Sequence, residues 1–246
     1  GTLAAFLYEQ GKLELDLSLQ HYYSAFHRED VTLRQLLTHT SGLDPFIPNR
    51  DQLTAPELKA ALNHLTVLED KTFRYTDVNF LLLGFMLEEI YGQSLDQIFQ
   101  SQIFQPWGLA KTSFGPVPGA VPTVRGVQDG QVHDPKARVL GIHAGSAGLF
   151  STLRDLEIFL EHYLQDDFAD HLTQNFSKEP GKMRSLAWNL EGSWLDHTGY
   201  TGTFIMYNRE EQKAAIFLSN RTYEKDERAQ WILDRNQLMD LIRIEL

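Results

Sequence analysis

Helical and extended patterns are segregated along this chain, and that order constrains the fold more than any other feature of the sequence. Apolar residues with helical spacing dominate the first two thirds of the chain. Short runs rich in β-branched and aromatic residues follow, and a last amphipathic pattern ends it. This order predicts an α+β fold with an antiparallel sheet and argues against a doubly wound parallel sheet. The expected helices cover residues 2–10, 32–38, 55–65, 77–91, 95–104, 152–164 and 229–246, and the expected strands lie in residues 185–192, 203–208 and 213–220. The run NREEQ (208–212) between the last two strands is expected to form a hairpin loop.

Composition excludes several classes of function. The net charge of −11 and the absence of any Lys/Arg-rich run argue against a nucleic-acid partner, because phosphate binding needs clustered cations. The chain has no cysteine, which excludes disulfides, thiolate metal sites and a cysteine nucleophile. No apolar run is long enough to cross a bilayer, and no signal peptide is present. None of these features selects a cellular compartment.

Four short stretches, in a fixed order, carry the strongest functional signal. They read LLTHTSGL (36–43), YTDVNFLLLG (75–84), HDPKARVLGIHAGSAGLFST (133–152) and HTGYTGT (197–203). Together they resemble the serine β-lactamase and penicillin-binding-protein-like family, on its class C side, which includes D-alanyl-D-alanine carboxypeptidases and related esterases. The stretch IFLSNRTY (216–223) is similar to the strand that follows in that family. The resemblance covers nearly the whole chain.

The resemblance implies a β-lactamase/transpeptidase-like fold. An antiparallel sheet flanked by helices would form one subdomain, from residues 1–11 and 151–246. An all-helical subdomain would comprise residues 12–150. The first strands of the family's sheet would lie outside this chain. We expect Tyr75 and His197 to face each other across a cleft between the subdomains, where ligand sites are common.

The chemistry that the resemblance implies is acyl transfer through a seryl intermediate, on a peptide, β-lactam or ester substrate. Tyr75, in the Tyr-x-Asn/Ser motif, would share general base and acid work with a lysine. Asp77 stands where Asn is more usual, and an ionised carboxylate cannot donate a hydrogen bond. Read without the resemblance, Tyr75 is a half-buried aromatic residue and Asp77 the N-cap of the helix that follows.

The third motif of the family is an edge strand that ends in Lys/His-Thr-Gly, represented here by His197, Thr198 and Gly199. Gly199 would let a substrate lie close against the backbone. By resemblance, the N–H of Tyr200 is one oxyanion donor and Thr198 contacts substrate. With an ordinary pKa of about 6.5, His197 attracts a carboxylate less firmly than lysine would. Read alone, it is a partly exposed strand histidine.

The Ser-x-x-Lys motif, which would supply the nucleophile and its amine, is missing. No serine in residues 1–246 has a lysine three positions later. By resemblance, residues 2–10 are the end of the helix that carries this motif, so we expect it upstream of Gly1 and expect this chain alone to be inactive. The alternative is a catalytically inactive relative that binds a ligand, or that self-associates through an unpaired sheet edge.

Several other residues favour structural interpretations. We interpret His39 and Ser41 as parts of a turn in which His39 satisfies loop backbone groups, not as a Ser–His catalytic pair. The run AGSAG (144–148) lacks the strand that a nucleophile elbow requires, so we interpret it as a tight turn. No His or Asp spacing predicts a metal, and no cofactor is expected. Trp194 is interpreted as a core or rim residue that could line the cleft. In the last helix, the residues expected to pack on the sheet are Trp231, Leu233, Leu238, Leu241 and Ile242.

Overall fold

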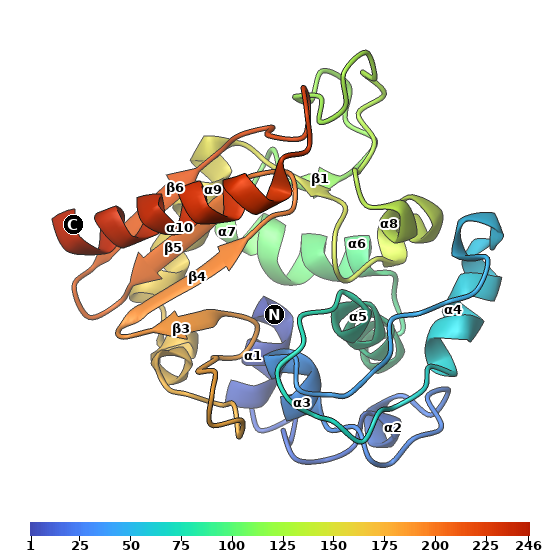
Figure 1. Cartoon of the computed structure of the whole chain (residues 1–246). Coiled ribbons are helices and arrows are strands. Elements are labelled where there is room, and N and C mark those ends of the chain that lie inside the picture. Colours follow the sequence, from blue (N-terminus) through green and yellow to red (C-terminus); the bar gives the residue numbers. More distant parts are fainter.

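A four-stranded antiparallel sheet stands between layers of helix in the computed structural model (Figure 1). The structure describes residues 1–246 apart from the side chain of residue 51. Consecutive strands are neighbours, so short turns connect them, and residues 209–212 form the predicted hairpin loop. The strands are β3 (Asn189–Glu191), β4 (Trp194–Thr198), β5 (Phe204–Asn208) and β6 (Lys213–Phe217).

The two faces of the sheet pack against different helices because side chains alternate along each strand. Phe204 and Met206 of β5 face α10 (Arg228–Glu245), which lies across the front of the sheet in Figure 1. Tyr207 faces the other way, toward α9 (Leu153–Gln165), and its ring centroid is 5.4 Å from that of Tyr163.

The face that α10 presents to the sheet differs from the expected one. Met239 is the buried residue of the helix, and Leu238 and Ile242 pack beside it. Leu233 and Leu241 are 59% and 57% exposed, so the prediction that they pack on the sheet was wrong. A helix repeats every 3.6 residues, and a stripe through Met239 leaves both leucines on the outer flanks.

The other helices match the predicted pattern in broad outline. The expected helix at 95–104 divides into α6 (Leu95–Phe99) and a π-helical turn (Gln100–Phe104). A small sheet pairs β1 (Ser113–Phe114) with β2 (Leu149–Phe150) inside the part expected to be all-helical. The remaining helices are α1 (Thr2–Glu9), α2 (Leu19–Tyr22), α3 (Leu33–Thr38), α4 (Ala55–Asn63), α5 (Val78–Tyr91), α7 (Gln105–Trp107) and α8 (Pro135–Leu140), and the 3-10 turns are Arg50–Gln52, Gly141–His143 and Asp167–Thr173.

Helix α5 is the buried axis of the helical part. Residues 78–87 are all buried except Phe80, so this part of the helix is covered on nearly every side, as its continuous apolar sequence predicts. Gly92 ends it in the left-handed conformation, with φ of 63°. Because α5 cannot move without disrupting the core, the residues that enter it at 75–77 are held in place.

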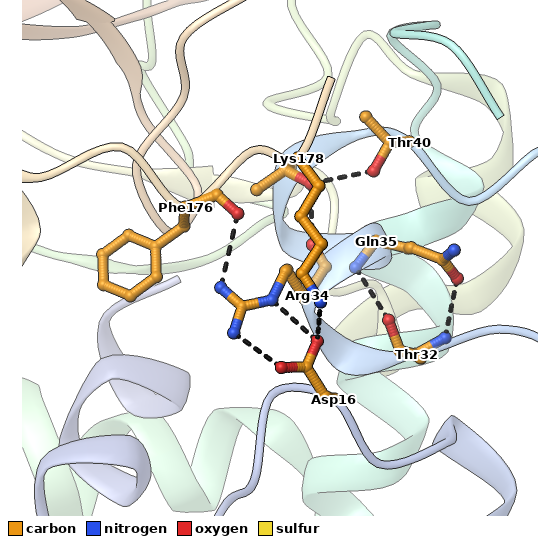
Figure 2. Close-up of polar contacts among 8 residues, drawn as sticks. Asp16, Thr32, Arg34, Gln35, Thr40, Phe176 and Lys178 are labelled. Atoms are coloured by element: carbon orange, nitrogen blue, oxygen red, sulfur yellow. Dashed lines mark hydrogen bonds and ion pairs between the residues drawn. The ribbon is translucent and has the colours of Figure 1, made fainter. Parts of the chain in front are cut away.

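Helix α3 is fixed to two loops by charged contacts (Figure 2). The carboxylate of Asp16 accepts from Arg34 at 2.8 and 2.9 Å and from Lys178 at 2.9 Å, which holds the pKa of Asp16 far below its usual range. Thr32 and Gln35 form a capping box at the start of the helix. Residues 12–18, α3 and residues 176–180 are thereby joined on one side of the molecule.

The Gly- and Pro-rich segment 115–138 is anchored to the loop that follows β6. Asn220 Nδ2 donates to the carbonyl of Pro122 at 3.0 Å, and Thr222 Oγ1 donates to the carbonyl of Thr123 at 2.8 Å.

Among the residues described, no helix combines the length and apolar character needed to span a membrane.

We predict that Gly145→Ala lowers the free energy of unfolding by about 1–3 kcal/mol. A Cβ at this position would collide with the carbonyl oxygen of Phe80 and lie 3.0 Å from Gly84 Cα, so the loop must move away from α5. Urea denaturation measures the effect. Gly181→Ala is the matched control, because its Cβ would meet only the flexible carboxylate of Glu179. Equal stability of the two variants would contradict the close packing of this loop on α5.

Candidate functional site

Two side chains from opposite halves of the chain meet at one place. Tyr75 lies in the segment that leads into α5, and His197 lies near the end of β4. Their ring centroids are 6.3 Å apart, and the ring planes are tilted by 52°. Tyr75 is 57% exposed and His197 is partly exposed, so one bound molecule can contact both. The structure thus brings the two residues together, and their catalytic roles stay predictions.

His39 holds the Tyr75 segment against the core. It ends α3 in the left-handed conformation, with φ of 58°, and is only 1% exposed. Its carbonyl oxygen accepts from the N–H of Arg74 at 2.9 Å, and its Nδ1 accepts from the N–H of Thr76 at 3.4 Å. The imidazole also lies 4.5 Å from the Tyr75 ring, centroid to centroid. One buried residue therefore sets the position of the phenol.

The hydrogen bonds around His39 determine its tautomer. Ser41 Oγ donates to Asn79 Oδ1 at 2.7 Å, which orients the amide so that Asn79 Nδ2 donates to His39 Nδ1 at 3.0 Å. Nδ1 accepts both bonds, so Nε2 carries the proton of a neutral ring. Burial first, then the charge of Arg184, lowers the pKa of His39 to about 2. These contacts confirm that His39 satisfies backbone groups of the loop, and Ser41 Oγ donates to Asn79 instead of to His39.

A buried cation lies beside the two histidines. Arg184 is 1% exposed, and its guanidinium is 5.4 Å from the centroid of the Phe73 ring. Its Nη1 donates to Asn189 Oδ1, and Asn189 Nδ2 donates to Asp196 Oδ1 at 2.7 Å. Burial lowers the pKa of Arg184 to about 10, which still leaves it charged at neutral pH. In this chain of hydrogen bonds, the amide of Asn189 lies between the Arg184 guanidinium and the carboxylate of Asp196.

This cation and the surrounding protein set the protonation of the site. Burial, and then the charge of Arg184, lower the pKa of His197 to about 4, while Asp196 opposes the shift. Desolvation raises the pKa of Tyr75, and Arg184 partly offsets it. At neutral pH the site therefore presents a neutral imidazole and a protonated phenol. His197 supplies no positive charge for a substrate carboxylate.

Asp77 has a partner that sequence reasoning missed. Its Oδ2 accepts from Lys136 Nζ at 2.6 Å, and the lysine side chain is 8% exposed. Lys136 lies in α8, whose first turn is capped by Asp134. The only sequence signal was an N-cap and proline pattern at 134–135, which marks a helix start and says nothing about the pairing. The ion pair thus satisfies the Asp77 carboxylate, which lies two positions after Tyr75 in the chain.

In the loop after β4, more than one backbone N–H group has no acceptor among the described residues, and that of Tyr200 is one of them. The carbonyl of Gly199 accepts from the N–H of Gly202 at 3.2 Å, and the N–H of Gly199 donates to the carbonyl of Thr203 at 2.6 Å. Among the described residues, the N–H of Tyr200 has no hydrogen-bond acceptor. A Cβ on Gly199 would lie 2.5 Å from Thr203 Oγ1, so a larger residue here would have to displace the side chain of Thr203. Thr198 pairs with Phe204 and is partly exposed.

Two other residues considered in the sequence analysis do not contribute to the site around Tyr75 and His197. Trp194 packs beneath α10, on the face of β4 opposite to His197, and does not line the site. Ser146 follows a 3-10 turn, not a strand, so no nucleophile elbow forms.

Two surface hollows of about 480 and 470 Å³ lie away from this site. The first lies beside α6 and the second beside Asp16 and Arg34, and neither is lined by Tyr75 or His197. The part of the chain that the structure describes contains no group of three or more metal-ligating side chains.

Comparison with known proteins identifies the family. A family model described as β-lactamase matches residues 1–239. This chain belongs to the β-lactamase family. A putative D-alanyl-D-alanine carboxypeptidase from Escherichia coli O157:H7 is 27% identical over 284 residues, and the alignment covers 88% of this chain and 65% of that protein. Its counterpart from strain K12 is 26% identical with the same coverage. The chain thus spans about 65% of the length of these curated relatives.

Solved structures agree on the β-lactamase fold. A β-lactamase/D-alanine carboxypeptidase from Pseudomonas syringae superposes with a TM-score of 0.68 at 18% identity, covering 94% of this chain and 79% of that one. EstCE1, a hydrolase with promiscuous acyltransferase activity, gives a TM-score of 0.70 at 20% identity, covering 90% and 77%. The predicted α+β, β-lactamase/transpeptidase-like fold is confirmed, including the antiparallel sheet flanked by helices.

We predict that stability falls as the pH is lowered below about 6.5, partly because His39 stays neutral in the folded state. Its folded pKa lies below its unfolded pKa, so the unfolded chain binds the extra proton and acid favours unfolding. The slope is about 1.4 kcal/mol per pH unit for each such histidine. His39→Asn, which tolerates the left-handed backbone, should reduce the slope by that amount between pH 6 and 4 in urea denaturation.

His27→Gln, at an exposed position, is the matched control for the loss of one imidazole. An unchanged slope in the His39 variant would contradict a buried, neutral His39.

Proposed function

We propose that this chain forms the substrate-facing part of a seryl acyl-transfer site that hydrolyses peptides, β-lactams or small esters. The observation that carries the proposal is the approach of Tyr75 to His197 directly beside a loop whose Tyr200 N–H is free to donate. A phenol, a strand edge and a free N–H are what acyl transfer needs around the reacting carbonyl. The names of the relatives, carboxypeptidases and an acyltransferring hydrolase, support this reaction class.

In the proposed reaction, Tyr75 moves protons. At neutral pH the phenol is protonated, so it can give a proton to the leaving group. To act as a base it must first lose that proton, and the nearby Arg184 charge favours the phenolate that results. Lys136 balances Asp77 and so limits the negative charge that would oppose this step.

The proposed reaction also needs a nucleophile. Residues 1–246 contain no Ser-x-x-Lys motif that would supply it. We propose that a seryl group outside these residues completes the site, next to α1 and Tyr75. Without it, the chain binds a substrate between Tyr75 and the β4 edge and does not turn it over.

A second candidate function is assembly without catalysis. In the part of the chain that the structure describes, β6 pairs with β5 on one side and with no strand on the other. An open edge of this kind can accept a strand from another chain or from a second copy. The residues of β6 are all partly exposed, which leaves its backbone accessible.

Labelling with a fluorescent penicillin and a fluorophosphonate tests the proposal. We expect no covalent label on the 246-residue chain and a single seryl label on the product of its full reading frame. In that product, Tyr75→Phe should lower kcat for an ester such as p-nitrophenyl acetate by about 100-fold or more. Tyr91→Phe, at the opposite end of α5, is the matched control and should leave kcat unchanged.

Each outcome separates the two candidates. Turnover by the 246-residue chain, or a full-reading-frame product that takes no label, would overturn the acyl-transfer proposal. Sedimentation equilibrium of the 246-residue chain that shows a monomer at all concentrations would count against assembly through β6.

A further inference from the structure

We infer that Arg221 is a positioning residue that fixes the Tyr200 peptide and thereby keeps its N–H pointed at the reacting oxygen. The inference rests on the proposed acyl-transfer function for its catalytic meaning, while its structural part stands on the contacts of Arg221 alone. Arg221 lies in the segment after β6, and its side chain is 7% exposed, which is unusual for an arginine on a loop.

Arg221 reaches two consecutive carbonyl groups of the loop. Its Nε donates to the carbonyl of Tyr200 at 2.8 Å, and its own backbone N–H donates to the carbonyl of Thr201 at 2.9 Å. The next carbonyl, of Gly202, accepts from Ser219 Oγ at 3.0 Å. Residues 219–221 thus bind every carbonyl from 200 to 202.

These bonds orient the free donor because peptide groups are planar and trans. The N–H of Gly202 belongs to the peptide whose Thr201 carbonyl accepts from the backbone N–H of Arg221, and it donates to the carbonyl of Gly199 at 3.2 Å. The side chain of Arg221 acts on the peptide before it: Nε holds the carbonyl of Tyr200, and so fixes the peptide that joins Tyr200 to Thr201. The carbonyl of Gly199 and the N–H of Tyr200 belong to one peptide and point in opposite directions. Fixing the carbonyl of Gly199 therefore points the N–H of Tyr200 outward.

The side chain of Tyr200 is held by the same arginine. The guanidinium lies 4.9 Å from the centre of the Tyr200 ring, and both groups bind Asp226, the phenol at 2.5 Å. Gly202 has φ of 113°, and a Cβ there would collide with Ser219 Oγ and lie within 3.1 Å of the Arg221 side chain. Gly202 is therefore packed directly against Ser219 and Arg221, without space for a side chain.

Arg228 offers a matched comparison. Its guanidinium also lies over the Tyr200 ring, at 5.4 Å, but it is exposed and makes no hydrogen bond to the carbonyls of residues 199–202. Replacing Arg228 removes a cation–π contact and a charge. Replacing Arg221 removes these, the ion pair with Asp226 and the hydrogen bond to the Tyr200 carbonyl.

The first experiment measures amide hydrogen exchange by NMR on the 246-residue chain and needs no activity. We expect Arg221→Met to speed exchange of the Gly199 and Gly202 N–H groups at least tenfold and to shift the Tyr200 amide resonance. Arg221→Lys, which keeps a donor and the charge, should restore part of the protection. Arg228→Met should leave the three amides unchanged. Unchanged exchange in Arg221→Met would overturn the inference.

The second experiment measures ester hydrolysis by the product of the full reading frame. Removing an oxyanion donor costs about 100- to 1,000-fold in kcat, so misorienting one is expected to cost about tenfold. KM should change less than twofold, because the bond strengthens only in the transition state. An unchanged kcat in Arg221→Met would overturn the catalytic meaning of Arg221. A wild-type protein without activity would instead overturn the proposed function, and the exchange data would still decide whether Arg221 fixes the loop.

Discussion

The candidate site depends on a buried histidine that is kept neutral. His39 ends α3, accepts hydrogen bonds through Nδ1 from Thr76 and Asn79, and lies beside the Tyr75 ring. A protonated ring could not accept these bonds, and a buried charge beside Arg184 would be costly. Because α5 is fully packed, a neutral His39 gives the Tyr75 segment one position relative to the core.

The charges of the site are arranged around this neutral centre. Burial, and then the positive charge of Arg184, lower the pKa values of both His39 and His197, and the same charge favours the Tyr75 phenolate. Lys136 neutralises Asp77. The site therefore holds its permanent cations below the surface, while the surface offers uncharged hydrogen-bonding groups and the N–H of Tyr200. Such a site suits a reaction in which negative charge appears only during the transition state.

The sequence predicted those parts of the structure that local patterns determine. The helices at 2–10, 77–91 and 152–164 carry continuous apolar spacing with recognisable caps, and the structure has all three within one or two residues. The approach of Tyr75 to His197 was predicted through the family motifs, because no local pattern relates residues 122 positions apart. The hairpin at 209–212 followed from two strand-like runs with a polar turn between them.

The remaining features arise from tertiary packing, which local patterns do not encode. The pairing of Lys136 with Asp77 depends on how α8 approaches α5, and nothing in the Gly- and Pro-rich run that contains residue 136 indicates a buried lysine. The face of α10 was predicted wrongly because its apolar residues surround much of the helix, so only the sheet selects Met239. The two-residue strands β1 and β2 are too short to show a period.

The most direct test of the neutral His39 is a long-range ¹H–¹⁵N NMR spectrum of the histidine rings, recorded from pH 7 to pH 4. The structure predicts that the His39 ring shows an unprotonated Nδ1 and a protonated Nε2, and that neither signal changes over this range. A His39 ring that gains a proton near pH 6.5, or that carries its proton on Nδ1 at pH 7, would contradict the account.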